Sequence, residues 1–160
     1  MKRQNAPHPI FKWAGGKASL IPTYEKMGLI PEDVNRYYEP FFGAGAMFFY
    51  LWNKGVVDKA VISDINIDLY NVYNLIKYHC DELIDYSLTM NLSPKSDTYY
   101  RNRDRFNLFK QQKIYSADLE QRFERAILMM YLNKTGYSGM YRENKQGLFN
   151  VPCGNYKNPN

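Results

Sequence analysis

The residues best placed to do chemistry are two glycines and an acid. Gly43 and Gly45 lie between two apolar stretches, and Asp64 stops the next apolar segment, AVIS. Asp64 follows Gly45 at roughly the 20-residue distance at which an acid binds a ribose hydroxyl in nucleotide-binding domains. A glycine turn between strand and helix directs backbone N–H groups toward a ligand. The spacing predicts a nucleotide-containing cofactor; the alternative is a tight turn, with Asp64 capping the next helix.

Phe48 indicates which cofactor the turn would hold. A dinucleotide fingerprint has a small residue at this position, because helix and strand approach closely around a pyrophosphate. A bulky ring there favours a cofactor with a nucleoside and no diphosphate, and S-adenosylmethionine fits this description. Glu39, just before the turn, is a candidate for binding its amino-acid end, and aromatic faces attract its sulfonium cation. The GxxxxGK[ST] spacing of a P-loop is absent from the turn.

The elements that must position these residues follow an α/β pattern. Residues 36–42 predict a buried strand, and the glycine turn leads from it into an apolar helix over 44–53. A second strand is expected at 60–63, followed by a helix from 66 to about 79 with apolar residues at helical spacing. A further helix is expected at 17–27. Strand, helix and strand in this order predict a parallel pair with a right-handed crossover.

The second half of the chain has a different pattern. Three segments rich in polar residues have helical patterns: residues 81–90, 97–112 and 117–134. Residues 136–157 are rich in Gly, Asn, Tyr and basic residues, and predict a β-hairpin or looped ribbon with its turn at 144–147. The change in composition near residue 80 predicts an α/β part over 1–80 and a helical-plus-hairpin part over 81–160.

The basic composition points to a polyanionic partner. Lys and Arg number 21 against 16 for Asp and Glu, which gives a net charge of +5 and a pI near 9.1. Many of the 15 tyrosines lie in polar surroundings, where their rings could stack on bases or lie along a sugar–phosphate chain. The alternative is a merely basic protein whose tyrosines line the rim of its core. The arginines of 97–112 alternate with acids, so a solvated charged face is the alternative there.

Several classes of site and location are disfavoured. Cys80 and Cys153 are too few for a disulfide framework, and neither they nor His8 and His79 have metal-ligand spacing. No stretch approaches the roughly 20 apolar residues of a membrane span. The basic N-terminus lacks the apolar run of a signal peptide. We therefore expect no metal site, no membrane association and a cytoplasmic location.

Four stretches, in order along the chain, resemble one enzyme family. They are FKWAGGK, EPFFGAGAMFF, SDIN and LNKTGYSGMYRENKQGLFNVPCGNYK. Together they resemble the Dam-type (alpha-group) DNA adenine-N6 methyltransferases, over nearly the whole chain from Pro9 to Pro159. The resemblance implies S-adenosylmethionine as cofactor, double-stranded DNA as partner and methyl transfer to a flipped adenine, as in restriction-modification systems. It also implies an incomplete Rossmann-like methyltransferase fold with a helical and β-hairpin target-recognition region.

The resemblance assigns roles to individual residues. Those matching the S-adenosylmethionine site are Trp13, Lys17, Glu39, Gly43, Gly45 and Asp64. Those matching positions that contact or lie near DNA are Lys12, Asn133, Tyr137, Met140, Arg142, Pro152, Tyr156 and Lys157. Met140 and Arg142 match hairpin residues that read bases, and an arginine suits a bidentate contact with guanine. Asn155 stands where close relatives that read GATC carry an arginine, so that recognition sequence is not implied.

The catalytic motif of the family is absent from these 160 residues. The family uses Asp-Pro-Pro-Tyr, after the recognition region, to hold the amino group of the flipped adenine; the Asn-Pro-Asn at residues 158–160 lacks the second proline and the aromatic. Three explanations are open: a fragment of a longer enzyme, a truncated product, or half of a split enzyme. An exposed sheet edge would then predict a second chain or a homodimer. We expect the isolated chain to be inactive. One alternative is a non-catalytic module that binds S-adenosylmethionine or DNA. Another is a nicotinamide-type oxidoreductase, and Phe48 argues against this one.

Overall fold

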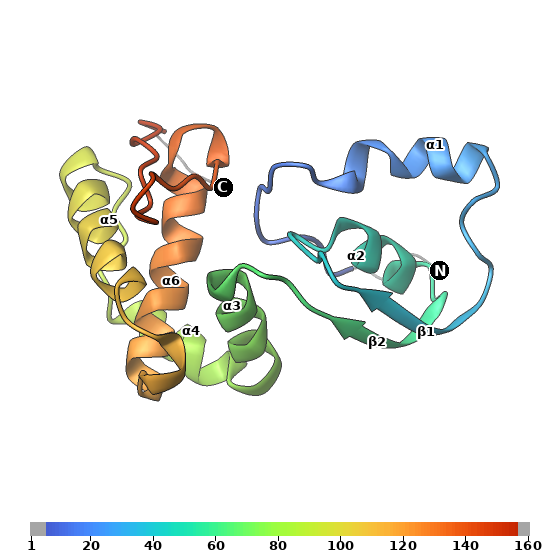
Figure 1. Ribbon diagram of the computed structural model, residues 1–160, viewed down its shortest axis with the longest axis horizontal. Coiled ribbons are helices and arrows are strands. Elements are labelled where there is room, and N and C mark those ends of the chain that lie inside the picture. Colours follow the sequence, from blue (N-terminus) through green and yellow to red (C-terminus); the bar gives the residue numbers. More distant parts are fainter. Residues whose placement is uncertain (1–5, 157–160) are drawn as a thin grey trace. The chain divides into compact units, whose positions relative to one another are not determined.

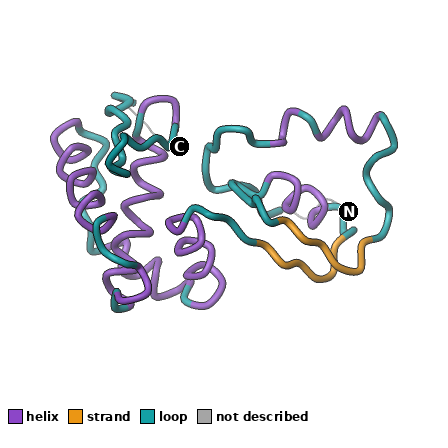
Figure 2. The backbone as a smooth tube through the Cα atoms, viewed as in Figure 1, coloured by secondary structure: helices purple, strands orange, loops and turns teal. Residues whose placement is uncertain are grey.

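The computed structural model describes residues 6–156 (Figure 1). They form two compact units that divide between Ile65 and Asn66. The first unit holds a 3₁₀ helix, two α-helices and two strands: η1 (Lys17–Ser19), α1 (Ile21–Lys26), β1 (Val34–Glu39), α2 (Ala46–Asn53) and β2 (Val57–Ile62). The second holds four α-helices and two 3₁₀ helices: α3 (Ile67–Tyr78), α4 (Cys80–Leu88), α5 (Ser96–Lys110), η2 (Ile114–Ser116), α6 (Leu119–Thr135) and η3 (Tyr137–Gly139). Figure 2 shows that both strands of the described chain belong to the first unit.

The first unit is a β–α–β segment. β1 and β2 pair in parallel, and the register places Glu39 opposite Ile62 at the carboxyl end of the pair. Beyond the strands, the N–H of Ser63 donates to the carbonyl of Glu39 at 3.0 Å, so the two chains stay together up to the glycine turn. Helix α2 packs on one face through ring contacts such as Tyr37 with Phe48, whose centroids are 6.3 Å apart. The predicted parallel pair is confirmed. The prediction that its strands are buried is wrong, because Tyr38, Val61 and Ile62 are 62%, 60% and 37% exposed.

Prolines account for two differences from the expected boundaries. The single helix expected at 17–27 is divided into η1 and α1, and Pro22 stands in the first turn of α1, where its missing N–H is tolerated. The strand expected over 36–42 ends at Glu39, since Pro40 has no N–H to donate to a ladder.

Helix α6 is the centre of the second unit. It packs against α3, α4 and α5, and its fully buried side chains include Ile127, Leu128 and Leu132. The three helices predicted for this half of the chain are confirmed, with their ends moved by a residue or two. A helix both long and apolar enough to cross a membrane is absent from residues 6–156.

Residues 136–156 follow α6, and we call them the ribbon. Two isolated antiparallel bridges join its limbs, one between Gly136 and Cys153 and one between Glu143 and Phe149. A regular β-hairpin does not form in the described ribbon, because η3 and the connections around it interrupt the ladder. Of the two predicted forms, the looped ribbon is the one observed.

The turn of the ribbon is closed by Asn144. Its N–H donates to the carbonyl of Leu148 at 2.9 Å, and its side-chain oxygen accepts from the N–H groups of Gln146 and Leu148 at 2.9 and 3.0 Å. The turn predicted at 144–147 is therefore confirmed.

Candidate functional site

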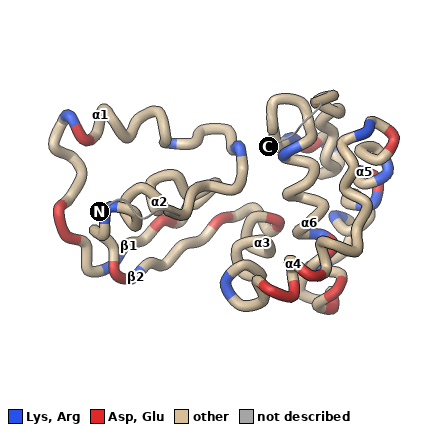
Figure 3. Tube along the Cα trace, turned by 180° about the vertical axis from the view of Figure 1, so that it is seen from behind, with Lys and Arg blue, Asp and Glu red and all other residues tan. Residues whose placement is uncertain are grey.

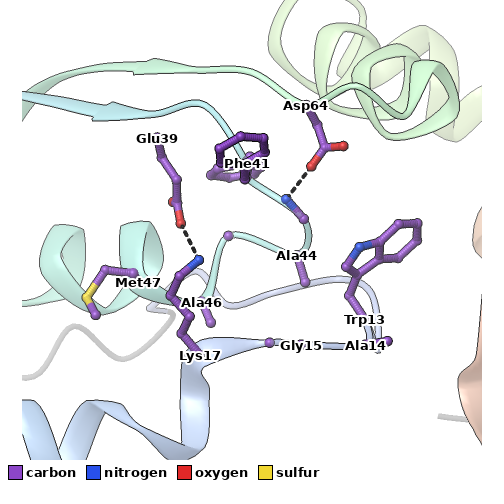
Figure 4. Close-up of a pocket in the computed structure, with 14 residues that line it drawn as sticks. Trp13, Ala14, Gly15, Lys17, Glu39, Phe41, Ala44, Ala46, Met47 and Asp64 are labelled. Atoms are coloured by element: carbon purple, nitrogen blue, oxygen red, sulfur yellow. Dashed lines mark hydrogen bonds and ion pairs between the residues drawn. The ribbon is translucent and has the colours of Figure 1, made fainter.

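A hollow in the first unit gathers the residues predicted to bind a cofactor (Figure 4). Its volume is about 240 Å³, and its wall comes from residues 13–17, from residues within 39–47 and from Asp64. The wall includes all six predicted cofactor residues: Trp13, Lys17, Glu39, Gly43, Gly45 and Asp64. It lies beyond the carboxyl ends of the parallel strands, where open α/β sheets bind their ligands.

The turn at this hollow requires glycine at both positions. Gly43 and Gly45 have φ angles of 54° and 74°, which residues with a Cβ rarely adopt. A Cβ on Gly45 would lie 2.3 Å from Cζ of Phe42, and one on Gly43 would lie 3.0 Å from Cδ1 of Trp13. The N–H of Gly43 donates to Oδ2 of Asp64 at 2.7 Å, so the acid fixes the turn that follows the neighbouring strand.

Asp64 is not the N-cap of helix α3. Asn66 is the cap, because its Oδ1 accepts from the N–H groups of Asp68 and Leu69 at 3.0 and 3.1 Å. The alternative that explained Asp64 as a helix cap is therefore wrong. A carboxylate offers about four acceptor positions, so the bond to the glycine turn is compatible with a further hydroxyl donor from a ligand in the hollow.

Glu39 places a buried charge in the hollow. Its side chain is 9% exposed, and it lies 3.6 Å from the ammonium of Lys17, whose side chain is 46% exposed. Oε2 of Glu39 is buried and has no hydrogen-bond partner among the described residues. Leaving such an oxygen unpaired is costly, so it marks a place where a donor from a ligand would bind. Burial, and then the nearby Glu39 carboxylate, raise the pKa of the Tyr37 hydroxyl.

The hollow presents groups of both charges. Ala46 and Met47 line it at the start of α2, where the first N–H groups of a helix carry partial positive charge. Together with Lys17 they favour a carboxylate, whereas Glu39 favours an ammonium and Asp64 a hydroxyl. This combination is complementary to an amino acid joined to a nucleoside. Among residues 6–156, no group of three or more His, Cys, Asp or Glu side chains is arranged to hold a metal ion.

The ribbon exposes most of the residues predicted to contact DNA. Tyr137, Met140 and Tyr156 are 56%, 37% and 38% exposed, and Arg142 and Pro152 are exposed as well. They lie on both limbs of the ribbon and combine aromatic, apolar and basic side chains.

The Arg142 guanidinium is held across the ribbon. Its Nε donates to Oδ1 of Asn150 at 2.8 Å, and its Nη2 donates to the backbone oxygen of the same residue at 3.3 Å. A guanidinium has five N–H donors. The contact with Asn150 orients the group and leaves donors for a bidentate contact with a base.

Two of the predicted DNA residues lie elsewhere, and a third is not described. Asn133 is 1% exposed, and its amide donates to the carbonyl of Gly139 at 2.7 Å, so it supports the ribbon from inside. Lys12 is exposed but belongs to the first unit. Lys157 is outside the described residues.

The basic residues of α5, visible in Figure 3, have partners within the second unit. Arg105 forms a two-point ion pair with Glu124 of α6 at 2.7 and 2.9 Å. The Arg103 guanidinium lies 4.8 Å from the centroid of the Tyr100 ring. These contacts favour the alternative of a charged helical face over a row of arginines that contact DNA.

A buried ion cluster in the second unit was missed by sequence reasoning. Asp68 is 1% exposed; it accepts from Nε of Arg125 at 2.6 Å, from Nζ of Lys110 at 3.1 Å and from the hydroxyl of Tyr141 at 2.9 Å. Lys110 also donates to Glu143 at 2.6 Å. The cluster joins α3, α5, α6 and the ribbon. The one sign of it in the sequence is an acid within the apolar face of helix α3. Such an acid is expected to be buried, and buried acids are nearly always paired with a basic group.

Comparisons with known proteins agree with the chemistry of the two units. Residues 13–160 match the model of the D12 class N6 adenine-specific DNA methyltransferase family. The chain is 40% identical to the type II methyltransferase M.MjaIII of Methanocaldococcus jannaschii, over 94% of this chain and 53% of that protein. It is 38% identical to the type II methyltransferase M1.LlaDCHI of Lactococcus lactis subsp. cremoris, over 94% and 49%. It is 34% identical to the DNA adenine methylase of Escherichia coli K12, over 99% and 51%. The chain thus spans about half the length of these curated relatives.

Proposed function

Because the chain belongs to the D12 class N6 adenine-specific DNA methyltransferase family, we propose that it binds S-adenosylmethionine in the hollow of the first unit and duplex DNA through the ribbon. When bound, S-adenosylmethionine would supply the methyl group and leave as S-adenosylhomocysteine. The acceptor would be N6 of an adenine turned out of the duplex, which would lose a proton as the new bond forms. We place this reaction in the cytoplasm, with cofactor binding within residues 1–80 and DNA recognition within residues 81–160. The two compact units themselves divide earlier, between Ile65 and Asn66.

The observation that carries the cofactor proposal is the buried, unpaired Oε2 of Glu39. The α-ammonium of S-adenosylmethionine would satisfy it, and Lys17 with the start of α2 would bind the carboxylate. Asp64 would accept from a ribose hydroxyl while it holds Gly43. The ring of Trp13, which lines the hollow, would offer an aromatic face to the sulfonium.

The DNA proposal rests on the exposed part of the ribbon. Tyr137 and Tyr156 offer rings that can stack on bases, and Arg142 offers a guanidinium suited to guanine in the major groove. The net charge of +5 favours a polyanion and predicts binding that weakens with salt, because phosphate contacts release counterions.

The acceptors that hold the adenine amino group would come from outside these 160 residues, on a further segment or on a second chain. The exposed apolar surface of the first unit supports this proposal: Phe41, Tyr38 and Val61 are 76%, 62% and 60% exposed. Tyr38 and Val61 pair with each other within the sheet and Phe41 follows β1; exposed apolar groups of this kind are the expected contact area for such a segment.

Calorimetric titration with S-adenosylmethionine tests the cofactor site. We expect the chain to bind it and to bind NAD much more weakly. Hydrogen bonds to a charged group are worth about 1.5–3 kcal/mol, so Glu39→Gln should weaken binding roughly ten- to hundredfold. Glu25→Gln is the matched control, because Glu25 belongs to the same unit but pairs with Lys54 away from the hollow. Equal affinity of wild type and Glu39→Gln would refute the assignment of Glu39.

An assay for transfer of a labelled methyl group to duplex DNA distinguishes a methyltransferase from the second candidate function, a binding module that transfers no methyl group. The 160 residues alone should bind cofactor and DNA but transfer little label, and activity should appear when an Asp-Pro-Pro-Tyr-containing part is added. Robust transfer by the 160 residues alone contradicts the proposal that the acceptors lie outside them.

A further inference from the structure

We propose that Asn107, on helix α5, is a specificity-determining positioning residue that fixes the register of the ribbon. It would contact no DNA itself, but would determine where the base-reading side chains stand. The inference rests on the proposed function, because it requires that the ribbon meets DNA.

The hydrogen bonds between the ribbon limbs leave the backbone groups of Phe149 facing away from the opposite limb. The N–H of Asn150 donates to the carbonyl of Arg142 at 3.1 Å, and the N–H of Asn144 donates to the carbonyl of Leu148 at 2.9 Å. These two bonds bracket the bridge that contains Phe149. At such a position of an antiparallel pair, the N–H and C=O of the residue point away from the opposite limb.

Asn107 binds both of these outward groups. Its Nδ2 donates to the carbonyl of Phe149 at 3.0 Å, and its Oδ1 accepts from the N–H of Phe149 at 2.8 Å. One side-chain amide therefore binds the edge of the ribbon as the backbone of a third strand would. Phe149 is 2% exposed and its ring packs edge-to-face on Phe106 at 5.9 Å, so water cannot easily replace the amide.

This contact selects one register of the ribbon on the helix. Side chains of an extended limb alternate between two faces, so a slip by one residue turns each of them to the opposite face. Two isolated bridges constrain a limb far less than a continuous ladder. A slip would bring Leu148 or Asn150 to the amide and would move Arg142, through its bond to Asn150, away from its place on the surface.

Sequencing of DNA selected by the chain from a pool of random duplexes tests this role. Asn107→Leu removes both hydrogen bonds with little change in size, and Asn107→Asp keeps the acceptor for the N–H of Phe149 but loses the donor. The matched control is Asn102→Leu, because Asn102 lies on the same helix and its amide binds the carbonyl of Asn91, away from the ribbon. Total binding and its salt dependence are measured for each protein in parallel.

Wild type and Asn102→Leu should enrich the same sequence. Asn107→Leu should bind the pool with unchanged salt dependence but lose base preference about tenfold, the size of one wrong base pair. The base preference of Asn107→Asp should lie between those of the wild type and Asn107→Leu. If Asn107→Leu does not fold, Asn107→Asp provides the test. A wild-type motif from both Asn107 variants overturns the inference and leaves the proposed function intact. No salt-dependent DNA binding by the wild type overturns the proposed function and the inference together.

Discussion

Neutralising Asp68 should destabilise the second unit strongly. Asp68→Asn leaves the side chain almost unchanged in size but removes the charge that faces Arg125 and Lys110, whose side chains are only 5% and 10% exposed. Removing one partner of a buried ion pair costs about 3–5 kcal/mol. Because asparagine keeps one acceptor oxygen and Lys110 keeps Glu143, we expect the lower end of that range.

The two tryptophans allow the units to be followed separately. Trp13 and Trp52 both belong to the first unit, whereas helices α3 to α6 dominate far-ultraviolet circular dichroism. With a urea dependence of about 2 kcal/mol per molar, Asp68→Asn should lower the dichroism midpoint by roughly 1–2 M. The fluorescence midpoint should not change.

An exposed pair provides the control for this measurement. Asp104 is 74% exposed and lies 3.8 Å from Arg103, and such surface pairs contribute about 0–1 kcal/mol. Asp104→Asn should therefore shift the dichroism midpoint only slightly. An Asp68→Asn midpoint equal to that of the control would refute the argument. Adding Arg125→Met to Asp68→Asn removes the uncompensated charge and should restore part of the lost stability; a double variant no more stable than Asp68→Asn would also refute it.

Two other predictions concern glycine and tyrosine. Gly45→Ala should lower the free energy of unfolding by about 1–2 kcal/mol for the left-handed backbone and by about 1–3 kcal/mol for overpacking, and should abolish cofactor binding. The control is Gly55→Ala, with φ of 72° and nothing within 4 Å of the added Cβ. It should lower the free energy of unfolding by the backbone contribution only. Burial raises the pKa of Tyr37, Tyr99 and Tyr141, so the unfolded chain binds fewer protons than the folded one above about pH 10. Stability should hold below that pH and fall above it, and an absorbance titration should show these hydroxyls ionising only on unfolding; their ionisation in the folded protein would contradict this.

Sequence reasoning found the elements and groups that depend on neighbours in the chain. Gly43, Gly45 and Asp64 were identified from spacing alone, because the chain geometry of a strand–turn–helix unit fixes the distance between them. The turn at 144–147 was likewise local, since Asn144 closes it with its own side chain.

What sequence reasoning missed joins residues that are distant in the chain. Asp68 is 57 residues from Arg125 and 73 from Tyr141. Such a pairing is determined by how helices pack, and no periodicity reports it. The same holds for Asn107, 42 residues from Phe149. Asn133, which the resemblance places near DNA, is buried instead.

The self-closed turn at Asn144 has a consequence for engineering. Its side chain and backbone supply the hydrogen bonds of the turn, and Asn107 hydrogen-bonds the backbone of Phe149 in the limb that follows. Lys145 and Gln146 between these fixed points are exposed, and Gln146 contributes only its backbone to the turn. Randomised residues at these two positions should leave the scaffold intact, so the tip is a natural place for a combinatorial library or a fluorescent label.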